Sequence, residues 1–269
     1  MKPIVIAQLT DTHIREGGAF AYGRVDTASF LARAVEHLNA LQPDAVVLTG
    51  DLVDYGTAAE YETFRTLIAP LRVPLHVIPG NHDSALIWDA FPSGDTARAG
   101  LGHTVDVGPL RLVMMDSTIP GAPNGLATEE RCRYVADALA GGPSLLFLHH
   151  PPFLTGIAHM DRNNCHEAAR LAAAIAPADG LLAVGCGHVH RMISATVGGR
   201  RTLIAPSPAH AVSLDLSPDG PATFHLEPPG VLLHVVTREA DGWHHVSHLS
   251  PIGAFAGPFP FFQEDGELV

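Results

Sequence analysis

The chain has 269 residues, of which 46% are hydrophobic, and this is enough for one large α/β domain. Its formal net charge is −12 without any basic run, which argues against binding a long nucleic acid through its phosphates. A small anionic substrate is still compatible with this balance, because bound metal ions can reverse the charge locally.

No apolar run approaches the ~20 residues of a membrane span, so no membrane partner is expected. The N-terminus, MKPIVIAQLTDTH, turns polar after a short apolar run and therefore predicts a first strand, not a signal peptide. Cys132, Cys165 and Cys186 lie far apart, a pattern that fits buried thiols in a reducing cytoplasm. We therefore expect a cytoplasmic protein.

The first third of the chain alternates strand-like and helix-like segments. Apolar runs predict strands, and apolar residues at helical spacing predict helices, the first of which Asp26 or Thr27 can cap. The predicted order is strand 4–10, helix 25–41, strand 44–50, helix 58–71 and strand 74–78. This βαβαβ order implies parallel strands joined by helical crossovers.

The rest of the chain continues this alternation and then becomes rich in strands. The predicted elements are strands 103–107 and 110–117 around a Gly-Pro turn, helix 128–139, strand 144–150, helix 167–175 and strand 180–188. They are followed by a hairpin at 192–206 and by strand candidates at 222–226, 231–238 and 243–249. We predict one mixed α/β domain with a core of residues 1–206 and a β-rich C-terminal extension, residues 207–269, that completes it.

Polar, metal-capable side chains stand at the ends of several predicted strands. The segments are DTH (11–13), GD (50–51), GNHD (80–83), HH (149–150) and GHVH (187–190). In open parallel sheets, ligands bind beyond the carboxyl ends of the strands, so all of these segments should meet at the same edge of the sheet. Their combination predicts a metal site.

Each segment also has a purely structural interpretation. Asp11 and Asp51 can be helix N-caps or turn formers, and Asn81 and Asp83 are common turn residues. The histidines at the other two strand ends can be ordinary polar residues there. The metal interpretation rests on the joint occurrence of all the segments at separate strand ends.

The order D-x-H, G-D, G-N-H-D, H and G-H-x-H resembles that of the calcineurin-like metallophosphoesterases. Within them, the chain is most similar to the bacterial class III cyclic-nucleotide phosphodiesterases and the related glycerophosphodiesterases. Similar stretches include AYGRVD, HMDRNNCHEAARLA and FAGPFPFF, so the resemblance covers nearly the whole chain. It implies a four-layer α/β/β/α metallophosphoesterase sandwich and a pair of metal ions.

The resemblance also implies which residues bind the ions. Asp51 matches the carboxylate that bridges two ions ~3.5–4 Å apart. The implied ligands are Asp11, His13, Asp51 and His190 for one ion, and Asp51, Asn81, His149 and His188 for the other. Nitrogen and oxygen ligands without thiolate fit Fe, Mn, Zn or Co and do not choose among them. His150 is expected beside the ligands, and Asp83 is expected to orient a histidine or to cap its turn.

Charge counting favours a small phosphodiester as the substrate. Two divalent ions, two aspartates and a bridging hydroxide leave a charge of about +1, which matches the single negative charge of a diester. The implied mechanism is attack on phosphorus by the metal-bound hydroxide, with Asp51 holding both ions. His82 resembles the family's catalytic histidine, which stabilises the transition state or protonates the leaving alkoxide. Its structural alternative is to orient a neighbouring ligand.

Four residues are expected to contact the substrate, namely Asn81, His82, Tyr22 and His210. The last two match substrate-pocket positions in the glycerophosphodiesterase relatives. Tyr22 can hydrogen-bond the ester or serve as an aromatic packing residue, and His210 can contact the phosphate or the leaving group. The expected partner is a small phosphodiester, either a 3′,5′-cyclic nucleotide such as cAMP or a glycerophosphodiester, and the sequence does not choose between them.

Two other classes of function use the same core. A phosphomonoesterase or protein phosphatase shares the metal ligands, but members of the protein phosphatase class resemble GNHE where this chain has GNHD. A non-catalytic scaffold would have lost ligands, whereas every ligand position is filled here.

The C-terminal segment is unusually aromatic, with Phe255, Phe259, Phe261 and Phe262 close together. It either packs on its own domain or joins subunits. Relatives form dimers and larger assemblies, so the resemblance implies a homo-oligomer.

Overall fold

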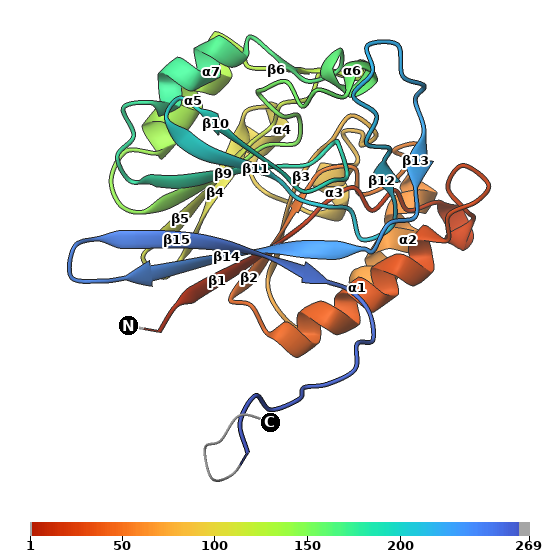
Figure 1. The fold of residues 1–269 in the computed structure, drawn as a ribbon. Coiled ribbons are helices and arrows are strands. Elements are labelled where there is room, and N and C mark those ends of the chain that lie inside the picture. The colour runs from red at the N-terminus through yellow and green to blue at the C-terminus, as the bar shows by residue number, and fades with distance from the viewer. Residues whose placement is uncertain (1, 264–269) are drawn as a thin grey trace.

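Two β-sheets lie face to face at the centre of the computed structural model, which describes residues 2–263 (Figure 1). The first sheet has the strand order β15-β14-β1-β2-β3. Its strands are β1 (Ile4–Leu9), β2 (Ala45–Thr49), β3 (Leu75–Ile78), β14 (Gly230–Arg238) and β15 (Trp243–Pro251). β1, β2 and β3 are parallel, as the sequence predicts, and β14 and β15 extend the sheet antiparallel beyond β1.

The second sheet has the order β10-β11-β9-β7-β5-β4. Its strands are β4 (Gly102–Val107), β5 (Leu110–Met115), β7 (Ser144–Phe147), β9 (Leu181–Cys186), β10 (Ile193–Val197) and β11 (Arg200–Ile204). The four central strands are parallel, and each outer strand is paired antiparallel through a tight hairpin.

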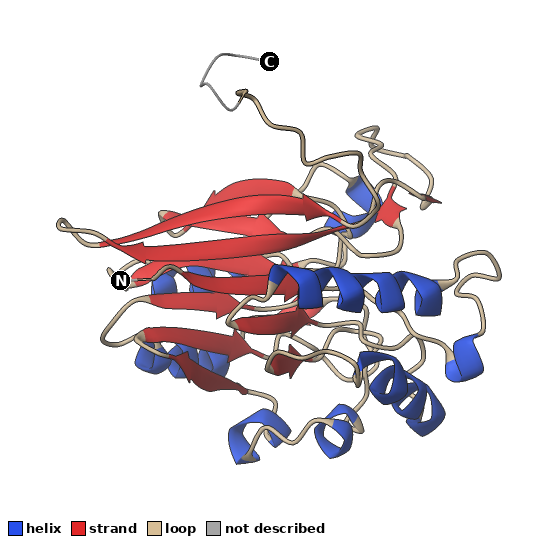
Figure 2. Cartoon of the chain, turned by 90° about the horizontal axis from the view of Figure 1, so that it is seen from below, coloured by secondary structure: helices blue, strands red, loops and turns tan. Residues whose placement is uncertain are grey.

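Helices cover the outer face of each sheet, as Figure 2 shows. On the first sheet these are α1 (Thr27–Leu41) and α2 (Ala58–Ile68), and on the second they are α5 (Glu129–Ala138) and α7 (Ala168–Ile175). Asp26 caps α1, since the Ser29 N–H donates to its carboxylate at 3.0 Å. The predicted α/β/β/α sandwich is therefore confirmed.

Short elements fill the connections. They are the 3₁₀ turn Glu16–Gly18, α3 (Ile87–Ala90), α4 (Asp95–Arg98), α6 (Ala158–Asp161), and the two-residue strands β6 (Gly125–Leu126), β8 (Cys165–His166), β12 (Ala211–Val212) and β13 (Phe224–His225). The sequence predicted β13 only as part of a longer strand and none of the others, because elements this short carry too few periodic positions. None of the helices within residues 2–263 combines the length and apolarity needed to cross a bilayer.

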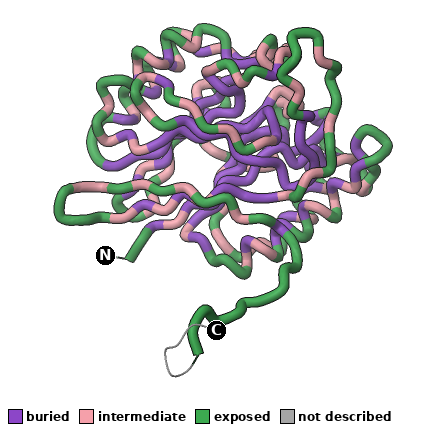
Figure 3. The backbone as a smooth tube through the Cα atoms, in the orientation of Figure 1, coloured by how far each residue is buried: buried purple, intermediate pink, exposed green. Residues whose placement is uncertain are grey.

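Buried hydrophobic side chains fill the space between the two β-sheets and the space between each sheet and its helices. In Figure 3, the buried parts of the backbone follow the strands. Between the two β-sheets, Ile6 and Val47 of the first pack against Leu112 and Phe147 of the second. Residues on the opposite faces of the same strands pack against the helices. Strands buried on both faces explain why the sequence shows continuous apolar runs.

The structure corrects one expectation about the site. The predicted polar strand ends do not share the edge of a single sheet, because β1, β2 and β3 belong to the first sheet and β7 and β9 to the second. The two sheets nevertheless point the carboxyl ends of these strands in the same direction, so the loops still meet.

The C-terminal segment has two parts. β14 pairs with β1, with Val236 opposite Ile4, and β15 forms the edge of the sheet. From residue 253 to 263 the chain is exposed and runs away from the body of the molecule, as the views in Figures 1 and 3 show.

Candidate metal centre

Loops from both sheets meet at the carboxyl ends of their strands. The loops after β1, β2 and β3 come from the first sheet, and those after β7 and β9 come from the second. They bring together the predicted ligands, which are Asp11, His13, Asp51, Asn81, His149, His188 and His190. All of them are buried except Asn81, which is half-buried.

The Asp51 carboxylate lies between the two sheets. Its Oδ2 is 3.4 Å from His149 Nε2 and 3.6 Å from His13 Nε2. Its Oδ1 accepts a hydrogen bond from the His82 backbone N–H at 2.9 Å. Because His13 comes from the first sheet and His149 from the second, this one carboxylate faces ligand atoms from both, as a bridging ligand must.

Oxygen acceptors hold the outer nitrogens of two imidazoles. His149 Nδ1 donates to the Thr49 carbonyl at 2.7 Å, and His190 Nδ1 donates to the His210 carbonyl at 3.2 Å. A proton on Nδ1 leaves Nε2 with a free lone pair, which is the form in which histidine binds metals. These backbone carbonyls therefore set both the tautomer and the orientation of the rings.

The inner nitrogens converge on a small volume. His13 Nε2 is 3.2 Å from His190 Nε2, and His149 Nε2 is 3.2 Å from Asn81 Oδ1. His188 Nε2 is buried without a hydrogen-bond partner among the described residues. A buried nitrogen without a partner is unfavourable by itself, and a bound cation satisfies it. The donor set thus fits metal ions.

Asp11 ties the loop after β1 to the loop after β9. Its two carboxylate oxygens accept the His188 backbone N–H at 3.1 and 3.0 Å, and its Oδ1 is 3.4 Å from His190 Nε2. Burial raises the pKa of Asp11 to about 6. The carboxylate is thus held in position while its charge is left to be neutralised by neighbouring cations.

The charges of Asp51 and His149 stabilise each other. Burial alone would raise the pKa of Asp51, but the positive charge of His149 and further histidines lowers it well below its ordinary value. Burial would lower the pKa of His149, yet Asp51 raises it to about 9. The site therefore favours negative charge on Asp51 and attracts positive charge beside it.

Strained backbone supports this arrangement. Positive φ angles occur at Asp11 (54°), His13 (44°), Asp51 (52°), His188 (73°) and His190 (58°). Such conformations cost roughly 1–3 kcal/mol per residue and persist where the surroundings fix them, commonly at functional sites. Here they occur at predicted ligands in the loops after β1, β2 and β9, where these side chains come together.

Glycines allow the loops to approach closely. A Cβ atom on Gly80 would collide with the Asp51 carboxylate, and one on Gly187 would collide with the Thr10 hydroxyl. The glycine that precedes the ligand in G-N and G-H is therefore required by contact between neighbouring loops.

A cavity of about 420 Å³ opens over the centre. His82, Tyr22 and His210 all line it, so the structure places these three predicted residues beside the ligands. The ring centre of His210 is 4.4 Å from that of His190 and 5.3 Å from that of Tyr22, and the ring centre of His82 is 4.6 Å from that of His13.

Two further predicted residues have identifiable contacts. Asp83 caps its own turn, since its Oδ2 accepts the backbone N–H of Gly80 at 2.9 Å and its Oδ1 accepts the Tyr61 hydroxyl at 3.0 Å. His150 Nδ1 is 2.9 Å from Ser117 Oγ, and one of its ring nitrogens lies within 4.8 Å of a ring nitrogen of His149 and of His188, beside the predicted ligands.

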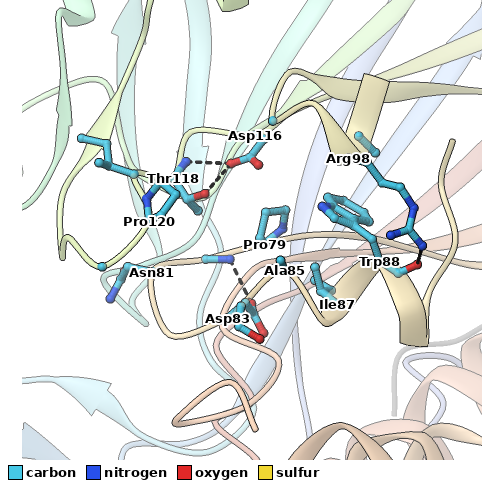
Figure 4. A pocket seen from close by; sticks show the side chains of 16 residues that line it. Pro79, Asn81, Asp83, Ala85, Ile87, Trp88, Arg98, Asp116, Thr118 and Pro120 are labelled. Atoms are coloured by element: carbon cyan, nitrogen blue, oxygen red, sulfur yellow. Dashed lines mark hydrogen bonds between the residues drawn. The ribbon is translucent and has the colours of Figure 1, made fainter. Parts of the chain in front are cut away.

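A second cavity, of about 330 Å³, shares Asn81 with the first (Figure 4). Pro79, Trp88 and Pro120 line it, and Asp116 accepts hydrogen bonds from the backbone N–H and hydroxyl of Thr118 at 2.8 and 2.7 Å. Among the described lining residues, histidines belong only to the first cavity. The first cavity is therefore the candidate site for the chemistry.

Sequence reasoning missed two residues that support the centre. Asp54 Oδ1 is 3.3 Å from His13 Nδ1, and its carbonyl accepts from His82 Nδ1 at 2.8 Å. Gln8 donates to Thr49 Oγ1 at 2.9 Å and to the Cys186 carbonyl at 2.8 Å, and so links the ends of β2 and β9. A polar residue inside the apolar run of β1 was the available signal for Gln8, and a second aspartate just after GD was the signal for Asp54.

A sandwich with carboxylates and imidazoles gathered at its strand ends defines a phosphoesterase of the metal-binding class. The profile of the calcineurin-like phosphoesterase family matches residues 4–192, and the chain belongs to this family. The predicted family is thereby confirmed, and the predicted hydrolase agrees with the family's description. The described residues at the strand ends include groups of His and Asp side chains that could hold metal ions.

Known proteins resemble this chain over most of its length. It is 40% identical to a probable glycerophosphodiester phosphodiesterase, GpdQ, of Arcobacter nitrofigilis over 99% of this chain and 100% of that protein. It is 34% identical to the 3′,5′-cyclic adenosine monophosphate phosphodiesterase CpdA of Pseudomonas aeruginosa over 76% of each chain. A dimetal phosphatase from Danio rerio has the same fold, with a TM-score of 0.64 at 13% identity over 92% of this chain and 99% of that one.

Proposed function

We propose that the protein is a two-metal phosphodiesterase that hydrolyses small diesters, either glycerophosphodiesters or 3′,5′-cyclic nucleotides. The observation that carries the proposal is the Asp51 carboxylate, which faces His13 from one sheet and His149 from the other. The named activities of the relatives, both phosphodiesterases, support it.

The proposed ligands divide into two sets that share Asp51. One ion is held by Asp11, His13, Asp51 and His190, and the other by Asp51, Asn81, His149 and His188. Their nitrogen and oxygen donors suit Fe, Mn, Zn or Co. When bound, the two ions supply an activated water as nucleophile and neutralise charge on the phosphate oxygens.

His82 is the proposed proton donor to the leaving alcohol. Its Nδ1 is bound to the Asp54 carbonyl at 2.8 Å, so Nε2 is the nitrogen available to the cavity. As the P–O bond to the leaving group breaks, the alkoxide takes the proton from this nitrogen. Its backbone N–H holds Asp51 at the same time, which couples the donor to the centre.

Tyr22 and His210 are the proposed substrate contacts on one side of the cavity. Tyr22 is 47% exposed, so its hydroxyl is accessible to an ester oxygen. His210 is buried, and its Nδ1 has no hydrogen-bond partner among the described residues. An unpaired nitrogen beside the centre is suited to bind a phosphate or leaving-group oxygen.

The charge of the cavity favours a diester over a monoester. Among its described lining residues there is no Lys or Arg, the side chains that commonly bind a dianionic phosphate. A diester carries one negative charge, which the centre itself can balance. This disfavours the alternatives of a phosphomonoesterase or a protein phosphatase.

The test is a comparison of substrates with Mn(II) supplied. We expect hydrolysis of bis(p-nitrophenyl) phosphate, and of either cAMP or glycerophosphoethanolamine, with kcat/KM at least tenfold above that for p-nitrophenyl phosphate. Elemental analysis should find two ions per chain. Two bound ions without hydrolysis of any diester would instead support a non-catalytic scaffold.

We also propose that the C-terminal segment joins subunits into a homo-oligomer. Phe259 is 75% exposed and Phe261 is 82% exposed on a segment that leaves the body of the domain. Exposed aromatic side chains in such numbers are typical of interaction surfaces. Deletion of residues 255–269 should lower the particle mass in sedimentation, and an unchanged mass would contradict this role.

A further inference from the structure

One wall of the active-site cavity is formed by a segment that no step of the proposed chemistry uses. After β7, the chain leaves the centre and returns through α6 (Ala158–Asp161) to β8. His159, Met160 and Asn163 of this segment line the cavity, as does Phe224 of β13. The stretch HMDRNNC, in which they lie, is one that the metal ligands leave unexplained.

The wall is held in place by its own polar contacts. Asp161 Oδ1 accepts the backbone N–H and the hydroxyl of Thr155, both at 2.7 Å, and its Oδ2 accepts the Gly156 N–H at 2.9 Å. Asn164 donates to Asp161 at 3.1 Å and to the Phe153 carbonyl at 2.7 Å. The residue between these two anchors, Asn163, is therefore presented on a fixed backbone.

The side-chain amide of Asn163 is available to hydrogen-bond a ligand. Its backbone N–H is bonded to the Met160 carbonyl at 2.8 Å, and no hydrogen bond joins its side chain to another residue in the described part of the chain. It is half-buried at the cavity. An amide that both donates and accepts is suited to a hydroxyl, which does the same.

The charge and the size of the cavity limit which part of a substrate can bind against the α6 segment. Asp51 is the one carboxylate among the described lining residues, and it is already paired with histidines, so an ammonium group finds no counter-charge here. The 420 Å³ must also contain the phosphate and the ions, which leaves space for a short arm. Met160 and Phe224 offer apolar surface to its carbon chain.

We infer that Asn163 is a specificity-determining residue that hydrogen-bonds the glycerol arm of a glycerophosphodiester. The inference rests on the proposed function and selects one of its two substrate classes. The α6 wall then binds the neutral, hydroxylated end of the substrate, while the proposed metal centre binds the phosphate.

The experiment compares Asn163→Leu with Arg162→Leu, a matched change at an exposed neighbour that does not line the cavity. The measured quantity is kcat/KM for glycerophosphoethanolamine divided by kcat/KM for bis(p-nitrophenyl) phosphate, which has no hydroxyl. We expect this ratio to fall about tenfold in Asn163→Leu, the usual effect of losing one hydrogen bond to substrate. Arg162→Leu should keep the wild-type ratio, and Asn163→Ser, which retains a donor and acceptor, should restore part of it.

Each other result overturns the inference in a recognisable way. Equal losses on both substrates would mean that Asn163 supports the fold of the site, and an unchanged ratio would mean that it does not touch the glycerol arm. A loss confined to cAMP would assign the wall to a nucleoside. A wild-type protein that hydrolyses the aryl diester but not glycerophosphoethanolamine refutes this inference alone, whereas a protein with two ions that hydrolyses neither refutes the proposed function as well.

Discussion

The molecule buries histidines in two places, the strand ends and the space between the sheets, and the pKa values of His149 in the first and His234 in the second shift in opposite directions. At the strand ends, His149 faces Asp51, and its pKa is raised to about 9 although burial lowers it. Between the sheets, burial lowers the pKa of His234 to about 3, and its hydrogen-bond partners among the described residues, Gln8 and His245, offer no negative charge to oppose this. Both imidazoles are buried, so the Asp51 carboxylate is what distinguishes His149 from His234, whereas burial also lowers the pKa of His188 and His190 at the strand ends.

The two places are nevertheless connected. His245 Nε2 donates to His234 Nδ1 at 3.0 Å, and His234 Nε2 donates to Gln8 Oε1 at 3.0 Å. Gln8 in turn donates to Thr49 Oγ1, and the Thr49 carbonyl accepts from His149 Nδ1 at 2.7 Å. The neutral histidines thus support the backbone that orients a proposed ligand.

Removal of the Asp51 charge should abolish the difference between the two places and have the largest effect. Asp51→Asn keeps a residue that tolerates positive φ, so the fold should persist, whereas kcat/KM for bis(p-nitrophenyl) phosphate should fall at least ~1,000-fold. Elemental analysis should find fewer than two ions per chain. Asp137→Asn, an exposed control on α5, should retain both ions and activity; two ions and normal turnover in Asp51→Asn would refute the bridging role.

His82→Ala tests the proton donor without touching a metal ligand. The value of kcat for glycerophosphoethanolamine should fall by roughly 10²–10⁴, the usual contribution of general acid catalysis. The loss should be smaller for bis(p-nitrophenyl) phosphate, because an aryloxide leaves without a proton. His248→Ala on β15 is the control, and equal losses on the two substrates would argue for an orienting role instead.

Gln8→Leu should weaken the connection between the two places. It leaves Thr49 Oγ1, the Cys186 carbonyl and His234 without their buried partner, so unfolding free energy should fall by about 2–4 kcal/mol. Urea denaturation measures this loss. If the chain of hydrogen bonds acts as one unit, the double variant with His234→Phe should lose less than the sum of the single losses.

The pH dependence of stability gives the smallest effect. An ordinary histidine has a pKa of 6.5, and that of His234 is about 3 in the folded protein, so between these values the unfolded chain binds more protons. Stability from this residue is therefore present above pH ~6.5 and is lost as pH falls, by up to about 1.4 kcal/mol per pH unit. In His234→Phe, urea denaturation at pH 4.5, 5.5 and 6.5 should show a slope smaller by that amount; the wild-type slope would contradict the assignment.

The sequence predicted which residues gather at the strand ends better than it predicted the residues that support them. Asp11, Asp51 and His149 stand where apolar runs end, and the ends of parallel strands are where ligands gather. That these ends come from two facing sheets follows from tertiary packing, which no local pattern in the chain encodes. The positive φ angles could not be predicted from the sequence either, because only the neighbouring glycines indicate how closely the loops approach each other.

The supporting residues were missed for a different reason. His234 and His245 are among those of the 17 histidines that lie outside the strand-end motifs and look scattered along the chain, and their pairing depends on β14 lying beside β15 and β1. α6 has only four residues, too few for a periodic pattern. The main helices and strands were predicted because each is long and its apolar face is continuous.

The pairing of β1 with β14 also determines when the first sheet can be completed during synthesis. Residues 4–8 pair with residues 232–236, so during synthesis one side of the first strand stays unpaired until residues 232–236 have left the ribosome. At ~5–20 residues per second this delay is on the order of ten seconds or more. A chain truncated before residue 230 would expose an unpaired edge of β1, and we expect such chains to aggregate and to be inactive.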